Sequence, residues 1–236
     1  MKKSFIVVAG LAAGLKLAAA GDISGTITLK GTPKPEMEIT QIKDDPNCGK
    51  LHTAPVKTRF YVVGSKGELA DVFVTLKGIS GKSSGASAAP ALLDQRGCEY
   101  VPYIFALQTN QKLLVKNSDP VLHNIHPTPT APGNKEENRA QMPSGPDLTF
   151  SFPSPETFLR FKCDVHPWMF CYACVVDHPY FAVSGTDGKY TIKDVPDGKY
   201  TIEAYHRKAA PATSPATQEV EVKGGRVTAD FTLEAK

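Results

Sequence analysis

The sequence predicts an all-β fold. Apolar and polar residues alternate in short segments, as at residues 23–30, 72–76 and 220–222, and this period of two is typical of half-buried strands. The 3.6-residue apolar period of a helix is not sustained after residue 20. Asp-Gly pairs at 187–188 and 197–198 stand between apolar segments and predict two hairpin turns. Together these features indicate a β-sandwich or a barrel-like fold.

The first 20 residues predict a secretory signal peptide. Met1-Lys2-Lys3 precedes an apolar stretch at residues 5–15, and Ala18-Ala19-Ala20 has the small-residue pattern of a cleavage site. A membrane anchor is the alternative, but the stretch is shorter than the roughly 20 residues that span a bilayer, and Lys16 interrupts it. We therefore expect a periplasmic or secreted protein with no membrane span.

Composition limits the classes of partner. The chain has 236 residues, 41% hydrophobic and 22% charged, which is globular composition sufficient for one large domain or two small ones. Of the 27 basic residues, Lys2, Lys3 and Lys16 lie in the signal peptide, which leaves 24 basic residues against 24 acidic ones. A net charge of zero argues against nucleic acid as a partner.

Four residues form a candidate metal site. Cys163, His166 and Met169 follow one another at intervals of three, and His123 lies upstream. Two imidazoles, a thiolate and a weak axial thioether are the ligand set of blue-copper sites, because the soft sulfurs suit Cu(I) while imidazole also accepts Cu(II). Taken singly, a buried cysteine or methionine is more often part of a core, but this spacing favours a metal.

Neighbouring residues support the same interpretation. Pro167 stiffens the segment between His166 and Met169. Phe161 shares one face of the incoming strand with Cys163, which would bury its ring beneath the site and exclude water. His126 is three residues from His123 and would point to the opposite face of a strand, so we expect only His123 to reach the metal.

The motif Cys-x-x-His-Pro-x-Met at 163–169 resembles the cupredoxin family and in particular the amicyanin-type ligand loop. The upstream segment Asn-x-Asp…His-Asn-x-His at 117–126 resembles the first-ligand region of the same type. The resemblance implies a Greek-key sandwich, one type 1 copper, and His123 as the first ligand. It also implies that Asn124 ties the two ligand loops together and that Pro167 and Trp168 lie where redox partners dock. The sequence departs from the family in its long proline-rich segment after His126 and in the two cysteines that follow Met169.

A second resemblance concerns the flanking regions. The run Asp-Gly-Lys-Tyr-Thr-Ile…Val-Pro-Asp-Gly-Lys-Tyr at 187–200, with Ile-Ser-Gly-Thr-Ile at 23–27, is similar to the carboxypeptidase regulatory-like (transthyretin-like) β-sandwich. The two parts are about 150 residues apart, which predicts an inserted module. The expected organisation is a signal peptide at 1–20, the first part of this sandwich at 21–68, a cupredoxin-like copper domain at 69–177, and the remainder of the sandwich at 178–236. One continuous unit over 21–236 is the alternative.

These resemblances imply a carrier of single electrons between redox proteins, such as a dehydrogenase and a cytochrome c. We do not expect an enzyme, because the sequence shows no Ser-His-Asp signature, phosphate loop or paired-carboxylate motif, and four protein ligands leave no open metal position. The alternative function is a secreted binding module for carbohydrate or protein, with a structural or storage copper.

Four cysteines remain besides Cys163, which allows three pairings. On an extended strand Cys171 and Cys174 would have Cα atoms about 10 Å apart, too far for a disulfide, and would face opposite sides. Cys48 and Cys98 both lie in turn-like sequences. We therefore predict a Cys48–Cys98 disulfide, with Cys171 and Cys174 as buried thiols.

Overall fold

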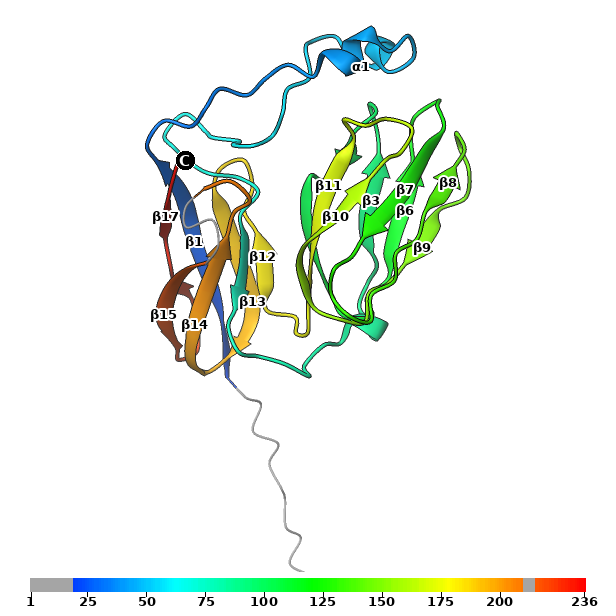
Figure 1. Ribbon diagram of the computed structural model, residues 1–236. Helices are drawn as coiled ribbons and strands as arrows, with labels where there is room; N and C mark the ends of the chain where they lie inside the picture. The colour runs from blue at the N-terminus through cyan, green and yellow to red at the C-terminus, as the bar shows by residue number, and fades with distance from the viewer. Residues whose placement is uncertain (1–18, 210–214) are drawn as a thin grey trace, which may run out of the picture.

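The computed structural model describes residues 19–209 and 215–236, and almost all of the regular structure in them is β-strand (Figure 1). The strands form four sheets, which pack as two sandwiches, each around its own cluster of buried apolar side chains. The predicted all-β fold with two sandwiches is therefore confirmed. Apart from Ala19 and Ala20, the predicted signal peptide lies outside the described residues.

The first sandwich, here called the terminal sandwich, contains both ends of the described chain. One of its sheets has the order β13-β1-β16, with β17 also paired to β1, and the other has the order β12-β2-β14-β15. Its strands are β1 (Ala20–Lys30), β2 (Phe73–Leu76), β12 (Phe181–Val183), β13 (Lys189–Pro196), β14 (Gly198–Tyr205), β15 (Ala216–Val222), β16 (Val227–Thr228) and β17 (Phe231–Glu234). The early strand β1 thus pairs with strands about 160 to 200 residues later, so the intervening chain is an insertion.

Strand β1 shows how the alternating pattern produces this sheet. Ile23 and Ile27 face the core and are fully buried, and burial of each isoleucine contributes roughly 1.5–3 kcal/mol. Gly25 lies between them, where a Cβ atom would stand only 1.9 Å from the carbonyl oxygen of Ala229. Glycine at this position therefore allows β1 to approach the C-terminal segment closely.

The two Asp-Gly pairs form turns, but the prediction that they close hairpins is wrong. Strand β13 pairs only with β1, while β12 and β14 belong to the opposite sheet, so each turn crosses from one sheet to the other. At the first turn the amide of Ile27 donates to the carbonyl of Gly188 (2.8 Å). Strand β1 therefore occupies the position beside β13 that a hairpin partner would have taken.

The second sandwich, here called the inserted sandwich, carries the candidate metal ligands. Its sheets have the orders β5-β11-β10-β7-β8 and β4-β3-β6-β9. Its strands are β3 (Ala91–Gln95), β4 (Tyr100–Val101), β5 (Ile104–Gln108), β6 (Leu113–Asn117), β7 (His123–Thr128), β8 (Arg139–Gln141), β9 (Leu148–Phe150), β10 (Glu156–Lys162) and β11 (Phe170–Val176). Because β7 and β10 are antiparallel, with Lys162 opposite His126, the start of β7 lies at the same end as the loop after β10.

The inserted sandwich begins later than the predicted boundary at residue 69. Strand β2 pairs with β12 and β14 of the terminal sandwich, and Leu69, Val72, Val74 and Leu76 belong to the core of that sandwich. The period-two pattern identifies β2 as a strand but not the sheet that it joins. At the other end of the insertion, the core of the inserted sandwich extends to Val175, and β12 belongs to the terminal sandwich.

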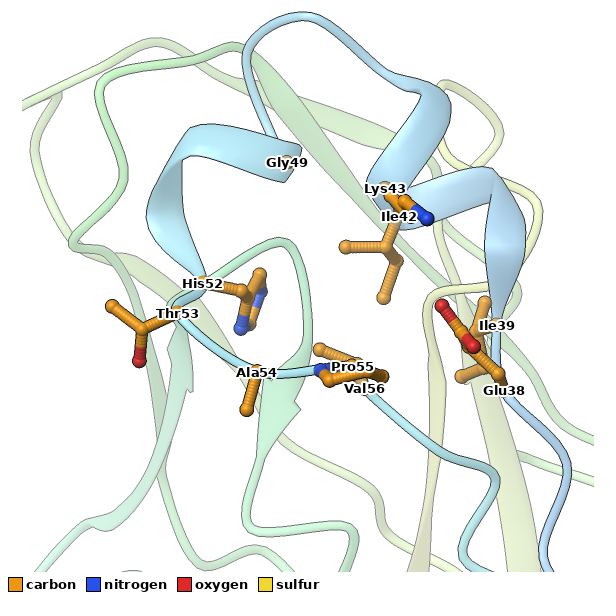
Figure 2. Close-up of a pocket in the computed structure, with 10 residues that line it drawn as sticks. All are labelled: Glu38, Ile39, Ile42, Lys43, Gly49, His52, Thr53, Ala54, Pro55 and Val56. Atoms are coloured by element: carbon orange, nitrogen blue, oxygen red, sulfur yellow. The ribbon is translucent and has the colours of Figure 1, made fainter.

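Residues 37–56, here called the cap, leave the terminal sandwich and lie over one end of the inserted sandwich (Figure 1). The cap contains α1 (Thr40–Asp44) and the 3-10 helix η1 (Gly49–Leu51), and a further 3-10 helix, η2 (Gly85–Ser87), precedes β3. Figure 2 shows the segments of the cap around a cavity of about 210 Å³. Ile42 of the cap packs against Cys48 and against Cys98 of the inserted sandwich. The sequence predicts residues 21–68 as part of the terminal sandwich, but the cap within this range contacts the inserted sandwich.

Among the residues that the structure describes, no helix is both long and apolar enough to cross a membrane.

Candidate metal centre

The loop between β10 and β11 is folded tightly by its own backbone. The amide of Cys163 donates to the carbonyl of Met169 (3.0 Å), and the amide of Met169 donates to the carbonyl of His166 (2.9 Å). These bonds bring the ends of the loop together at the edge of the core. The loop thereby holds Cys163 and His166 beside His123, the first residue of β7.

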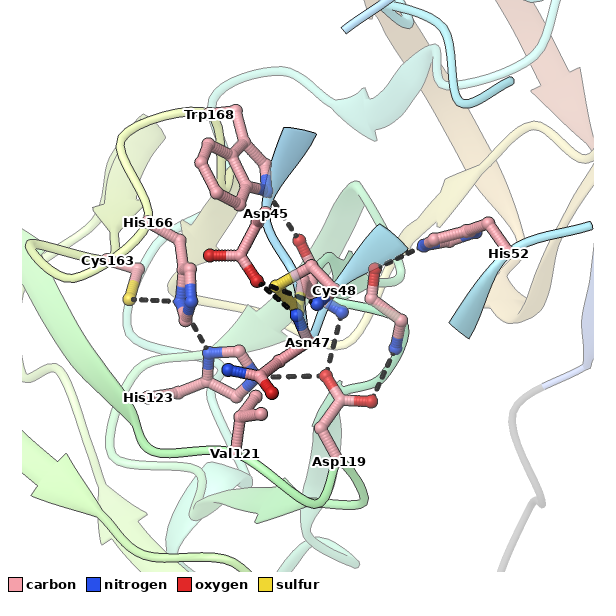
Figure 3. The surroundings of a disulfide bond; sticks show 12 residues. Asp45, Asn47, Cys48, His52, Asp119, Val121, His123, Cys163, His166 and Trp168 are labelled. Atoms are coloured by element: carbon pink, nitrogen blue, oxygen red, sulfur yellow. Dashed lines mark hydrogen bonds and ion pairs between the residues drawn. A yellow bond between two sulfur atoms is a disulfide. The ribbon is translucent and has the colours of Figure 1, made fainter. Parts of the chain in front are cut away.

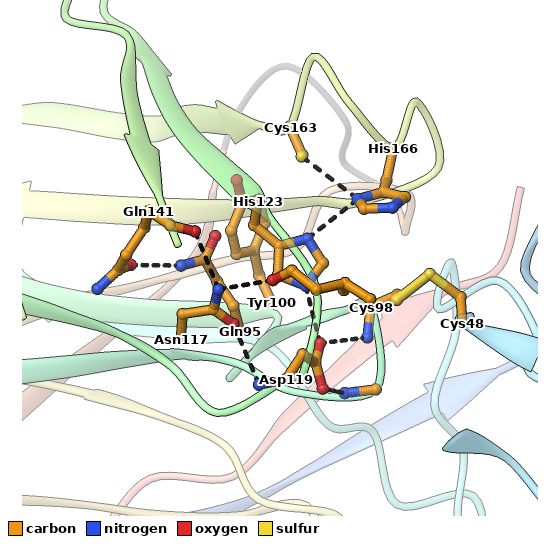
Figure 4. A network of polar contacts seen from close by, with 12 residues as sticks. Cys48, Gln95, Cys98, Tyr100, Asn117, Asp119, His123, Gln141, Cys163 and His166 are labelled. Atoms are coloured by element: carbon orange, nitrogen blue, oxygen red, sulfur yellow. Dashed lines mark hydrogen bonds and ion pairs between the residues drawn. A yellow bond between two sulfur atoms is a disulfide. The ribbon is translucent and has the colours of Figure 1, made fainter. Parts of the chain in front are cut away.

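Three of the four predicted ligands converge through specific atoms. The Nδ1 atoms of His123 and His166 are 3.0 Å apart, and the Sγ atom of Cys163 is 3.7 Å from Nδ1 of His166 (Figure 4). Donor atoms that share one ion lie roughly 3–4 Å apart, because bonds to metals such as zinc are about 2.0–2.3 Å long. All three side chains are buried, so the donor set and its spacing fit a single metal ion.

Met169 and Phe161 lie beside this group. Both are buried in the same cluster as Cys163. The Phe161 ring packs against Phe105 and Phe152, with centroids 5.7 and 5.8 Å away. The floor of the site is therefore apolar, which excludes water from the donor atoms.

Asn124 connects the two segments that carry the ligands. Its Oδ1 atom accepts hydrogen bonds from the amides of Asp164 (2.7 Å) and Val165 (3.3 Å) and lies 3.2 Å from Sγ of Cys163. The side chain of one strand thus fixes the loop that follows another. This is the arrangement that the sequence resemblance implies for Asn124.

The surroundings of Cys163 and His166 favour their metal-binding protonation states, whereas burial lowers the pKa of His123 but its contacts with Asp119 and Cys163 raise it above its usual value. Burial alone would raise the pKa of the Cys163 thiol, but the neighbouring His123 and hydrogen bonds from nearby backbone amides lower it below its usual value. Burial and the neighbouring His123 lower the pKa of His166. A thiolate and a neutral imidazole are the forms that bind metals.

His126 lies outside this group. Its Nε2 atom is 2.6 Å from Oε1 of Glu136, and its Nδ1 atom is 2.7 Å from Oδ2 of Asp164. Both ring nitrogens are therefore occupied by carboxylates at the surface. Of the two upstream histidines, His123 is the one that the structure brings to Cys163 and His166.

The cap covers the outer side of His166. The two sulfurs of the Cys48–Cys98 disulfide and a ring nitrogen of His166 lie within 4.8 Å of one another (Figure 3), and His166 is only 6% exposed. The indole N–H of Trp168 donates to the carbonyl of Cys98 (3.1 Å). Trp168 is thus half-buried against the cap, while Pro167 is exposed. The sequence did not predict this cover.

The other cysteines are arranged as the sequence analysis expects. Cys48 and Cys98 form a disulfide. Cys171 and Cys174 are free and fully buried. Burial raises the pKa of both thiols, that of Cys174 to about 12, so neither is a reactive thiolate at neutral pH.

Asp119 is a residue of the site that sequence reasoning missed. Its Oδ2 atom is 2.9 Å from Nε2 of His123, and it is buried at 5% exposure. The available signal was its place four residues before His123, in an Asn-x-Asp-Pro turn. Aspartate in a turn usually bonds only to its own backbone, so the signal did not indicate contact with a ligand.

Comparison with known proteins gives only weak matches. No protein-family description and no curated protein matches the chain. Among solved structures, a Cu(I) form of an amicyanin variant is 15% identical, with a TM-score of 0.33, over 43% of this chain and 97% of that one. A purple cupredoxin from Nitrosopumilus maritimus is 18% identical, with a TM-score of 0.30, over 36% of this chain and 98% of that one.

A copper-containing nitrite reductase from Thermus scotoductus is 16% identical, with a TM-score of 0.33, over 37% of this chain and 22% of that one. At such identities and scores these likenesses assign neither a family nor a ligand to the chain.

Proposed function

We propose that this protein is an exported carrier of single electrons with one type 1 copper, held by His123, Cys163, His166 and Met169. The observation that carries the proposal is the convergence of two imidazole Nδ1 atoms and one thiolate sulfur in a buried site. Met169, which is buried in the same apolar cluster as Cys163, is the proposed fourth donor of this blue-copper centre.

The chemistry of the donors favours copper over other metals. Structural zinc sites use cysteine and histidine without a thioether, whereas a weak methionine ligand beside His₂Cys is characteristic of copper. When bound, copper supplies one-electron redox chemistry. The role of the chain is to hold the donors in one arrangement for both oxidation states, and the bonds of Asn124 and the loop backbone support that role.

The same features support transfer rather than catalysis. Four protein donors leave no position for a substrate, and the apolar floor and the cap restrict the approach of water.

Redox proteins, such as a dehydrogenase as donor and a cytochrome c as acceptor, are the partners that this function requires. Pro167, which is exposed on the ligand loop, is a docking position for them. The Cys48–Cys98 disulfide supports export to an oxidising compartment.

Voltammetry of the purified, copper-loaded protein tests the proposal, with His123→Ala and His126→Ala as a matched pair of variants. The wild-type protein and His126→Ala should both give a reversible one-electron wave, because His126 is held by surface carboxylates. His123→Ala should lose the wave and most of its copper affinity. Copper bound without a reversible wave would instead indicate storage or a structural role, and equal behaviour of the two variants would show that the first ligand is misassigned.

A further inference from the structure

We propose that Asp119 is a positioning residue of the metal centre, which fixes the tautomer of His123 and connects that ligand to the loop at residues 97–98, which a disulfide joins to the cap. The proposal rests on the proposed function only for its copper-based measurements. Nothing in the sequence resemblance assigns a role to this carboxylate. It follows from three contacts made by one buried side chain and from their order along the chain.

The first step concerns His123. A neutral imidazole carries one N–H, and the nitrogen without a hydrogen offers its lone pair to a metal. The carboxylate at 2.9 Å from Nε2 can only accept, so it requires the hydrogen on Nε2. The lone pair of His123 is then left on Nδ1, the atom that faces Cys163 and His166. Hydrogen bonds of this kind set the tautomer and ring orientation of metal-binding histidines.

The second step concerns how Asp119 itself is held. Its amide donates to Oδ1 of Asn117 (3.1 Å). The side-chain amide of Asn117 in turn donates to the carbonyls of Val121 and Gln141, at 2.9 and 3.0 Å. The turn between β6 and β7 is thereby closed at several points. Asp119 has little freedom to leave His123 without breaking this buried network (Figure 4).

The third step concerns the disulfide. Oδ1 of Asp119 accepts from the amide of Gly97 (2.6 Å), and Oδ2 accepts from the amide of Cys98 (2.7 Å). Gly97 and Cys98 have φ values of +69° and +53°, and positive φ at a non-glycine residue such as Cys98 is costly unless its surroundings enforce it. The bond to Cys48 and the two hydrogen bonds to Asp119 together enforce this conformation.

These contacts form one continuous path from the cap to a metal ligand: Cys48 to Cys98, the amides of 97 and 98 to Asp119, and Asp119 to His123 (Figure 3). The loop at Cys98 also accepts the indole N–H of Trp168 on the other ligand segment. Loss of the disulfide should therefore loosen the loop, weaken the two donors to Asp119, and leave the imidazole of His123 less fixed.

Asp119→Asn is the test variant. It preserves size, but it replaces one acceptor oxygen with an NH₂ group that must face at least one of the three N–H donors. The control is Asp177→Asn. Asp177 also accepts a backbone amide and a hydroxyl, from Gly81 and Thr109, but it follows the far end of β11 and contacts no ligand.

The tautomer is measured first, on the metal-free proteins, by long-range ¹H–¹⁵N correlation of the imidazole nitrogens above pH 8. The wild-type protein and Asp177→Asn should show His123 protonated on Nε2, while Asp119→Asn should show a mixture of tautomers. This measurement does not depend on copper. A wild-type protein with this tautomer that failed to bind copper would therefore refute the proposed function and leave the role of Asp119 intact, whereas an Nδ1–H tautomer in the wild-type protein would overturn the inference.

Copper affinity and the electron paramagnetic resonance spectrum are measured next, by competition with a chromophoric chelator. Asp119→Asn should bind copper about 10–100-fold more weakly with an altered copper hyperfine splitting, while Asp177→Asn should match the wild-type protein. The role is merely structural if Asp119→Asn lowers the unfolding temperature but leaves the affinity and the spectrum unchanged.

A double-mutant cycle tests the connection to the disulfide. Cys48→Ser/Cys98→Ser should weaken copper binding and alter the spectrum in the wild-type background, but should have little further effect when Asp119→Asn is already present, because both changes act on one path. Additive effects would show that the disulfide does not act through Asp119.

Discussion

Replacement of Asn124 by alanine should release the ligand loop without removing a ligand. The change deletes the acceptor of the Asp164 and Val165 amides, at 2.7 and 3.3 Å, and the oxygen 3.2 Å from the Cys163 sulfur. It also removes the donor to Asn138. Asn124 is 6% exposed, so water cannot fully replace these bonds.

The magnitude follows from the number of bonds. A hydrogen bond contributes about 1 kcal/mol net, and the two amides belong to exposed residues that can partly rebond to water. We therefore expect Asn124→Ala to lower the free energy of unfolding by about 2 kcal/mol. Copper affinity should fall about 10–100-fold, as is typical when a residue that orients ligands is lost.

The matched control is Asn134→Ala. The Asn134 side chain makes three hydrogen bonds, with Ser154 and Glu156, but none of them reaches the ligand loop. Urea unfolding of the metal-free proteins gives the stability, chelator competition gives the copper affinity, and hydrogen exchange reports on the amides of Asp164 and Val165. Unchanged protection of these two amides in Asn124→Ala, or a loss of copper affinity equal to that of the control, would refute the reasoning.

Three further predictions concern the disulfide, pH and the axial ligand. Cys48→Ala/Cys98→Ala should lower the free energy of unfolding by about 4 kcal/mol in the chain-entropy model, because the disulfide closes a loop of 50 residues. Urea unfolding measures this change, and an unchanged unfolding midpoint would contradict the prediction. Burial lowers the pKa of His206 from 6.5 to about 4. As the pH falls, His206 is therefore protonated in the unfolded chain before it is protonated in the folded protein. The contribution of His206 to stability is complete above pH 6.5 and is lost, by up to about 3 kcal/mol, as the pH falls to 4. His206→Asn should therefore flatten the dependence of the unfolding free energy on pH. Equal slopes for the variant and the wild-type protein would exclude this role of His206. Met169→Gln should keep copper but lower the reduction potential, because a harder axial ligand favours Cu(II); an equal or higher potential by voltammetry would show that Met169 is not the axial ligand.

The sequence predicted those features that depend on local spacing. Period-two alternation identified β1, where Ile23 and Ile27 lie on one buried face, and it also identified β2, although all four residues of β2 are buried. The spacing of Cys163 and His166 indicated a shared site, since a short loop can bring both around one ion, and the disulfide followed from the turn-like settings of Cys48 and Cys98.

What the sequence did not predict depends on contacts between distant segments. The Asp-Gly turns appeared as hairpins because a turn does not specify which strand lies beside it, and β1 takes that place. The cap over His166 requires residues 37–56 to cross to another sandwich, which no local pattern encodes. Asp119 contacts His123 only because the turn between β6 and β7 and the loop at Cys98 come together.

The optical spectrum of the Cu(II)-loaded protein tests the central claim most directly. If Cys163 and the two histidines hold copper as proposed, charge transfer from thiolate to Cu(II) should give an intense visible band, blue or green, with one copper per chain. The matched variants are Cys163→Ser, which should lose the band entirely, and Cys171→Ser, which should keep it because Cys171 is a buried thiol outside the donor group. A copper-loaded wild-type protein without the band, or a Cys163→Ser variant that retains it, would contradict the account.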